Sequence, residues 1–140
     1  MIKVLLALVA AALFAGACLY VSLVDHPARM RLDDEAARAQ LRASLARAAP
    51  MQGGLATLSF LLGLWSWWKL GYPWLLAGAL LAIASLPLTL IVIQPLNRRL
   101  LAGPVGETKA LLGRWGRLHA LRTLFGLAAV AAYFAVFVWP

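Results

Sequence analysis

Three residues just before the C-terminal apolar segment have the types and spacing of a chemical site. Trp115, His119 and Arg122 stand at positions i, i+4 and i+7. On an α-helix they share one face within roughly 40–60°. An imidazole can transfer protons near neutral pH, and here it would lie between an aromatic ring and a fixed positive charge. Any chemistry of this chain is expected at this helix face.

The composition indicates that these residues are positioned by membrane helices. The 140-residue chain is 64% hydrophobic and only 13% charged, whereas soluble domains carry about a quarter charged residues. Four segments of about the length that crosses a bilayer lack charged side chains. We predict an all-α, four-transmembrane-helix bundle forming one domain over residues 1–140. The expected spans are residues 3–25, 51–69, 73–95 and 115–139.

Prolines mark the expected helix ends. Pro27 should end the first helix, because the residue before a proline is pushed out of the helical region. Residues 30–47 carry charged pairs at i,i+4 and an apolar edge, which predicts a short amphipathic helix on the cytoplasmic leaflet. It would be a solvated linker or a helix that docks a partner. Pro50 should break it, Pro87 should kink the third span, and residues 94–97 should close that span.

The net charge of +8 is distributed as membrane topology requires. Basic residues concentrate in residues 25–50 and 98–122, which the positive-inside rule assigns to the cytoplasm, with both termini outside a bacterial inner membrane. The expected partner is the lipid bilayer and not nucleic acid, because no basic patch on a soluble surface is available. The aromatic residues between 65 and 74 predict an interfacial belt, or alternatively a site that stacks an aromatic ligand.

The N-terminus has an alternative interpretation. It imitates a signal peptide, and residues 15–18 faintly resemble a lipoprotein cleavage site. The sequence stays apolar as far as Val24, so we expect a first span that is retained. Cys18 is the only cysteine, and no disulfide can form within the chain.

Alternating helix directions should bring distant polar residues to one end of the bundle. His26 and Asn97 are expected beside Trp115, His119 and Arg122 in a polar mouth on the cytoplasmic side, and polar groups in spans usually face the bundle interior. Plain alternatives stay open. Trp115 and Arg122 can be interface anchors, His26 can simply end a helix, and Asn97 can cap one.

A metal or haem site is an alternative that the pattern does not favour. Asp25, His26 and His119 imitate a set of two histidines and one carboxylate, but adjacent helical residues diverge by about 100°. A haem between His26 and His119 would have no attachment motif. A proton pathway is opposed by the lack of acidic residues inside the spans. We therefore expect no metal and no other cofactor.

Three separated motifs resemble those of the anthrone oxygenase-like family. They are residues 16–28 (GACLYVSLVDHPA), residues 94–100 (QPLNRRL), and the tryptophan, histidine and arginine at 115, 119 and 122. Named members are similar to small membrane oxygenases that convert anthrones to anthraquinones with molecular oxygen, without metal or flavin. The resemblance therefore implies a cofactor-independent oxygenase of anthrone-like or other electron-rich phenolic substrates.

The resemblance also implies roles for the candidate residues. His119 would be the base, and Arg122 and Asn97 would stabilise the substrate oxyanion. Trp115 would stack on a lipophilic aromatic substrate, and His26 would be the reserve base. The competing interpretation is a non-catalytic membrane protein, such as a small subunit or hydrophobic-ligand binder in a larger assembly, in which these side chains form a helix–helix network.

Overall fold

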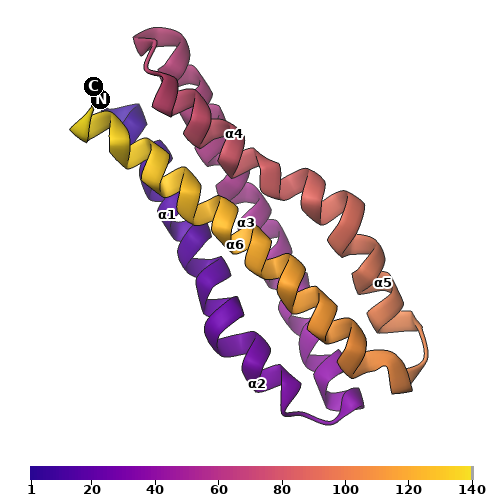
Figure 1. Ribbon diagram of the computed structural model, residues 1–140. Coiled ribbons are helices and arrows are strands. Elements are labelled where there is room, and N and C mark those ends of the chain that lie inside the picture. Colours follow the sequence, from indigo (N-terminus) through magenta and orange to yellow (C-terminus); the bar gives the residue numbers. More distant parts are fainter. Residues whose placement is uncertain (140) are drawn as a thin grey trace.

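The computed structural model describes residues 1–139, and all regular structure in that part of the chain is helical. Four long helical segments run side by side with alternating direction (Figure 1). Two of them contain a π-helical turn, labelled η. In chain order the elements are α1 (Ile2–Tyr20), η1 (Val21–Asp25), α2 (His26–Met30), α3 (Asp34–Leu70), α4 (Pro73–Leu88), η2 (Thr89–Ile93), α5 (Gln94–Ala102), the 3-10 turn η3 (Val105–Glu107) and α6 (Thr108–Val138).

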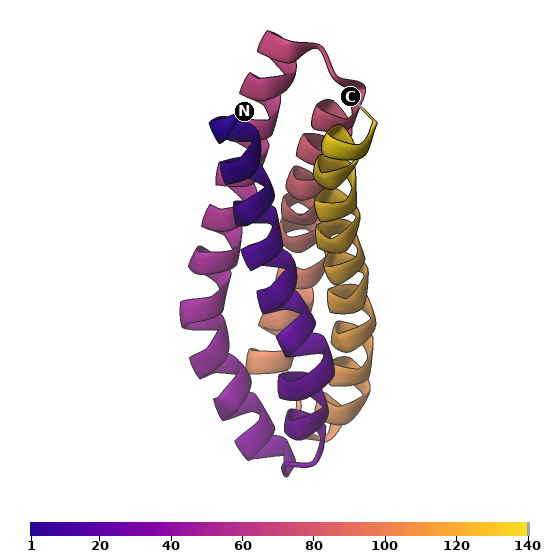
Figure 2. The ribbon, with the colours of Figure 1, turned by 90° about the vertical axis from the view of Figure 1, so that its left-hand side faces the viewer.

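Each long segment packs mainly against two others. α1 lies against α3 and α6, and α4 also lies against α3 and α6, so the four segments surround a common interior. The start of α1 and the end of α6 lie at the same end of the bundle (Figures 1 and 2). This arrangement brings the second half of the α1–α2 segment, the α5 region and the first half of α6 to the opposite end.

Three of the four segments are long and apolar enough to cross a membrane: Ile2–Met30, Pro73–Ala102 and Val105–Val138. These helices characterise the chain as a membrane protein. α3 is less apolar, because its first half carries charged residues and its second half has Gln52, Ser59 and Ser66 on the buried side. The prediction of a fourth span at residues 51–69 therefore stays a prediction.

Three predicted helix ends are wrong. The chain remains helical through Pro27, Pro50 and Pro95. Pro27 and Pro95 each follow a π-helical turn, in which the hydrogen bond reaches back five residues. The wider turn makes room for a ring that would clash with the preceding turn of a regular α-helix. The two π turns therefore allow both segments to continue toward the site.

The expected amphipathic connector helix is not a separate element. Residues 34–47 form the first half of α3, which continues through the exposed Pro50 to Leu70. Proline removes one hydrogen bond, but the helix packs on its neighbours along both halves, and tertiary packing outweighs local propensity. The N-terminus of α3 is capped by Asp33, whose carboxylate accepts a hydrogen bond from the Ala36 amide at 2.8 Å.

The core is formed by small residues at one end and larger ones at the other. Near the chain termini, Ala7, Ala11 and Ala129 are fully buried around Tyr133, whose hydroxyl donates to the Ser59 carbonyl at 2.9 Å. At the opposite end, a second cluster is built on leucines and includes Trp115. A tight turn at Gly71 joins α3 to α4; its φ of 76° is one that glycine adopts without strain.

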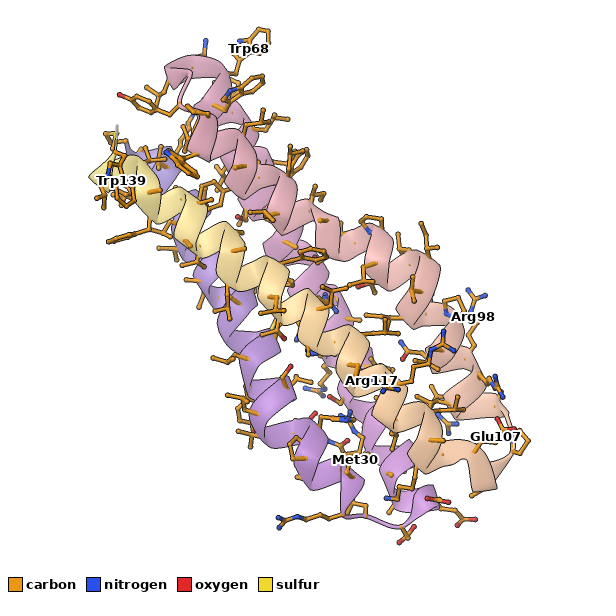
Figure 3. The ribbon with its side chains drawn as sticks, viewed as in Figure 1. Met30, Trp68, Arg98, Glu107, Arg117 and Trp139 are labelled. Atoms are coloured by element: carbon orange, nitrogen blue, oxygen red, sulfur yellow. The ribbon has the colours of Figure 1, made fainter. Side chains whose placement is uncertain are left out.

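The two ends of the molecule differ in chemistry. Figure 3 shows Trp68 and Trp139 toward the end that carries the termini, and Arg98 and Glu107 toward the other end. At this second end the last residue of α2 contacts the first turn of α6, since Lys109 Nζ donates to the Met30 carbonyl at 2.9 Å. The first and third connections therefore lie on the same end of the bundle, as alternation of the helices requires.

Candidate active site

The predicted helix face of α6 is turned into the bundle. Trp115 and His119 are each 3% exposed and Arg122 is 6% exposed. The neighbouring positions Arg114, Arg117 and others on the outer side are exposed. A buried imidazole and a buried guanidinium are costly in an apolar interior unless they have a structural or chemical use.

Trp115 is the centre of a small aromatic and polar cluster. Its indole Nε1 donates a hydrogen bond of 2.8 Å to Asn97 Oδ1 on α5. The His119 ring stacks on it, with centroids 4.9 Å apart and an interplanar angle of 21°. The His26 ring of α2 lies tilted against it at 5.4 Å. The structure therefore brings together four of the five predicted residues around one indole.

His119 is oriented by two hydroxyl groups. Its Nδ1 lies 3.2 Å from Ser22 Oγ of η1, and Ser22 Oγ lies 2.9 Å from Thr123 Oγ1. The Thr123 hydroxyl in turn is 3.0 Å from the backbone carbonyl of His119. The contact at Nδ1 leaves Nε2 as the ring nitrogen that can exchange a proton with a ligand.

Arg122, the fifth predicted residue, is placed differently. Its guanidinium lies over the ring of Phe14, 5.4 Å from the centroid. Its Nε is buried and has no hydrogen-bond partner in residues 1–139. A guanidinium carries five N–H donors, so this side chain still has donor capacity toward a ligand.

A close approach of two helices positions His26. The His26 ring rests on the backbone of Gly116 in α6, and a Cβ atom at position 116 would come within 2.7 Å of His26 Cδ2. Only glycine leaves room for the ring there. This dependence of the site on Gly116 was not predicted from the sequence.

The cluster around Arg29 was not predicted from the sequence. Arg29 is 1% exposed and lies 5.2 Å from the Trp115 ring centroid. It forms an ion pair with Asp25 at 2.6 Å and donates to Gln40, which itself donates to Asp25 at 2.7 Å. The signal was the i,i+4 spacing of Asp25 and Arg29, which the expected helix end at Pro27 concealed.

A central cavity lies beside these groups and is bordered by all four helical segments. Its volume is about 40 Å³, which is room for water molecules and not for a ring system. The side chains that line it include Arg29, Gln52, Asn97, Trp115, His119 and Arg122.

Two larger grooves adjoin the cavity, one on each side of α3. The first lies between α3 and the α1–η1 helix and has a volume of about 460 Å³. The second, of about 390 Å³, lies between α3 and the α4–α5 segment and shares Asn97 and Arg122 with the cavity. Each is as large as an ordinary small-molecule site. A polycyclic ligand would fit by joining a groove to the cavity.

The described side chains do not form a metal site. Within residues 1–139, no group of three His, Cys, Asp or Glu side chains is arranged to hold a metal ion. The functional groups around the cavity are instead an imidazole, guanidinium groups, amides and hydroxyls, which suit proton transfer and anion binding.

Apolar helices that enclose a polar, arginine-containing cavity define a membrane protein with a buried polar interior. A family model described as anthrone oxygenase matches residues 41–132, which is more than half of the chain. The protein belongs to the anthrone oxygenase family. The match includes Asn97, Trp115, His119 and Arg122, whereas His26 and Arg29 precede it.

A curated relative supports this assignment. Over 64 residues the chain is 39% identical to anthrone oxygenase tpcL of Aspergillus fumigatus. The aligned region is 41% of this chain and 39% of the relative, so the chain spans less than half the length of the curated relative it matches. No solved structure gives a significant match.

Proposed function

We propose that this protein is a membrane oxygenase that oxidises anthrone-like or other electron-rich phenolic substrates with molecular oxygen, using its own side chains without metal or flavin. The observation that carries the proposal is the stack of His119 on Trp115 at 4.9 Å, beside a cavity that Arg122 also lines. Membership of the anthrone oxygenase family supports the same reaction class.

The chemistry of an anthrone explains why such a site would suffice. Its methylene group lies between two aryl rings, and loss of one proton gives a delocalised enolate. The enolate gives one electron to oxygen, and the resulting radical and superoxide combine to form the carbon–oxygen bond of a peroxide. Loss of the second methylene hydrogen as a proton, with cleavage of the oxygen–oxygen bond, yields the quinone carbonyl and water. One anthrone and one oxygen molecule thus give one anthraquinone and one water.

Each candidate residue has a role in this series of reaction steps. His119 Nε2 takes the first proton, while Ser22 at Nδ1 holds the ring in place. Arg122 stabilises the enolate oxygen, an effect often worth several kcal/mol in a site without bulk water. Asn97 uses its Oδ1 for Trp115 and keeps its amide N–H groups for the substrate. Trp115 forms the aromatic wall, and His26 is the reserve base.

A lipophilic substrate would reach the site from the bilayer. The groove between α3 and the α4–α5 segment contains Asn97 and Arg122 at its inner end, so a polycycle lying in it would place its oxygen near the guanidinium. The cavity of about 40 Å³ would then hold only the polar edge of the ligand.

We also propose that α3 is a fourth membrane span. It packs along both α1 and α4, which are apolar enough to cross a bilayer, and both chain ends lie at the same end of the bundle (Figure 1). The arginine-rich end would face the cytoplasm of a bacterial cell and the termini would lie outside.

Oxygen uptake by the purified protein in detergent tests the proposed reaction. With a panel of anthrones, the wild type should consume oxygen above the uncatalysed rate, and His119→Ala should fall to background, a loss of at least about a hundredfold for removal of a general base. Thermal unfolding of both proteins shows whether the variant is folded. Equal background rates for the two folded proteins across a broad panel would contradict the proposal.

The alternative function is a non-catalytic subunit or hydrophobic-ligand binder in a larger assembly. The contact between Ser22 and Thr123, at 2.9 Å, favours it, because this pair joins the first and last helical segments. In that case His119→Ala would lower the melting temperature, and no anthrone would be consumed by the wild type.

A further inference from the structure

Three buried polar atoms have no hydrogen-bond partner among the described residues, and two of them belong to residues that line the central cavity. Within residues 1–139 they are His26 Nδ1, Arg29 Nη1 and Arg122 Nε. Both arginines line the cavity and are more than nine-tenths buried, with exposures of 1% and 6%. A buried donor without an acceptor is destabilising, and more so when it is charged. Two such donors at one cavity indicate that a ligand supplies the acceptors.

The charges at the cavity are unbalanced. Its described lining residues include Arg29 and Arg122 and no aspartate or glutamate. Asp25 neutralises Arg29 from outside this lining, through Nη2 at 2.6 Å. Arg122 has no ion pair with any residue that the structure describes. The cavity therefore carries an excess of about one positive charge, which favours an anionic ligand group.

The Arg29 guanidinium is held by a closed set of contacts. Its Nη2 donates to Asp25 Oδ2 and its Nε donates to Gln40. Gln40 Nε2 completes the triangle by donating to Asp25 Oδ1 at 2.7 Å. Two of the three guanidinium nitrogens are thus fixed, and Nη1 is the nitrogen that remains for a ligand. The same guanidinium lies over Trp115, the wall expected to contact an aromatic ring.

We infer that Arg29 is a second ligand-binding residue, which together with Arg122 holds an aromatic molecule through its ionised oxygen. The inference rests on the proposed function, in which the anion of a phenol or an enolised anthrone is the reactive species. It assigns the substrate class as an aromatic acid of the phenol or enol type. It also makes Asp25 the residue that moderates the positive charge of the site.

The ionisation of a bound dye tests this inference without turnover. Alizarin, a hydroxylated anthraquinone, changes colour when its phenol ionises. The protein is placed in lipid nanodiscs, and the dye is titrated with pH against empty nanodiscs of the same lipids. The wild type should make bound alizarin ionise at lower pH, with an acid dissociation constant raised about tenfold by two charged donors. Arg29→Gln should remove most of this effect, and Arg29→Lys should keep part of it.

Arg31→Gln is the matched control. Arg31 is two residues away, carries the same charge and is exposed, so its replacement should leave the dye titration as in the wild type. If Arg29→Gln, folded, ionises the dye as the wild type does, the inference is overturned. Oxygen uptake by the wild type would then still support the oxygenase. Loss of the shift in Arg29→Gln with no anthrone consumed would support the anion site and overturn the proposed reaction.

Asp25→Asn keeps the inference testable if Arg29→Gln does not fold. The amide keeps one oxygen to accept from Arg29, but it removes the negative charge and the oxygen that accepts from Gln40. The site then becomes more positive, and bound alizarin should ionise at still lower pH than with the wild type. An unchanged titration, or one displaced to higher pH, would overturn the inference, because a purely structural Asp25 gives no gain in anion binding.

Discussion

Contacts of a few ångströms distinguish the two imidazoles that are proposed as the base and the reserve base. His119 has a hydroxyl partner at Nδ1, Ser22 at 3.2 Å, whereas His26 Nδ1 is buried without a partner among the described residues. A ring held at one nitrogen presents the other in a fixed direction. This difference favours His119 over His26 as the group that takes the substrate proton.

Replacing Ser22 by alanine should impair catalysis more than binding. The lost contact is a neutral hydrogen bond worth about 0.5–1.5 kcal/mol, so we expect kcat to fall by up to about tenfold with KM little changed. Oxygen-uptake kinetics provide the measurement. Ser85→Ala is the control, since that buried hydroxyl bonds only within its own helix, to the Ala82 carbonyl. If the Ser22→Ala variant kept the full kcat, Ser22 would not be the residue that orients His119.

Gly116 should tolerate no side chain, because the His26 ring occupies the place of its Cβ. Gly116→Ala is expected to lower the free energy of unfolding by about 1–3 kcal/mol, as overpacking does. Gly113→Ala, one turn earlier in α6, is the matched control: nothing lies within 4 Å of its added methyl group. That control should be neutral or stabilising by about 0.5–1 kcal/mol. Thermal unfolding of the pair provides the comparison, and equal melting temperatures would contradict the packing argument.

Two π-helical turns, which local sequence rules do not predict, position the residues of the candidate site. The π turns η1 (Val21–Asp25) and η2 (Thr89–Ile93) each precede a proline and let the helix continue. As a result His26 and Asn97 lie within helices and not at their ends. π turns are frequent at functional sites, and here both lie in the segments that border the cavity.

Arg38 makes several hydrogen bonds from the first half of α3 to the residues around the third connection. Arg38 donates to Thr108 Oγ1 at 2.8 Å, to the Gly103 carbonyl at 2.9 Å and to the Pro104 carbonyl at 2.6 Å. These hydrogen bonds hold the first half of α3 against the bundle, whereas an independent surface helix was expected from the sequence. They also close the end of the bundle next to the leucine cluster around Trp115.

Arg38→Gln should loosen that connection. Hydrogen bonds from a charged donor contribute about 1.5–3 kcal/mol when buried, and partial exposure reduces this, so we expect a loss of about 1–2 kcal/mol in unfolding free energy. Limited proteolysis should cut the connection at residues 103–107 faster than in the wild type. Arg42→Gln is the control, because Arg42 has one exposed contact of 3.4 Å, to Leu101. Equal cleavage of the two variants would show that Arg38 does not hold the connection.

The side of the bilayer on which each terminus lies depends on the number of segments that cross it. Three helices meet the length and hydropathy of a span, and α3 lies between two of them. With four spans both termini lie on one side, and with three they lie on opposite sides. The concentration of arginine at the end opposite the termini favours the first arrangement.

Reporter fusions decide between these arrangements. Alkaline phosphatase, which is active only outside the bacterial cytoplasm, should be active when fused after Trp139 or after Gly71 and inactive when fused after Gly103. Green fluorescent protein should give the complementary pattern. Activity of the phosphatase after Gly103, with none after Trp139, would reverse the predicted orientation if green fluorescent protein fused before Met1 is also fluorescent, because both termini then lie in the cytoplasm. Reporter signals from opposite sides at the two termini would exclude α3 as a span.

Properties that depend on local sequence could be predicted. The membrane character follows from long apolar runs, because transfer of apolar surface from water is a sum over residues. The common face of Trp115, His119 and Arg122 follows from helical periodicity, and alternating helix directions suffice to bring Asn97 and His26 toward that face. The grouping of these residues could therefore be predicted from the sequence, as could the family.

Other properties were decided only by tertiary packing. Local rules end helices at Pro27, Pro50 and Pro95, but contacts with neighbouring helices outweigh the lost hydrogen bonds. The partner of His119 is 97 residues away in the sequence, and no periodicity links the two positions. In the sequence, Arg29 is one more basic residue near a membrane surface. In the structure, the helix continues past Pro27 and buries Arg29 against Trp115. Its burial depends on the free energy of the assembled bundle, in which the contacts of Asp25, Gln40 and the aromatic ring together offset the cost of removing a charge from water.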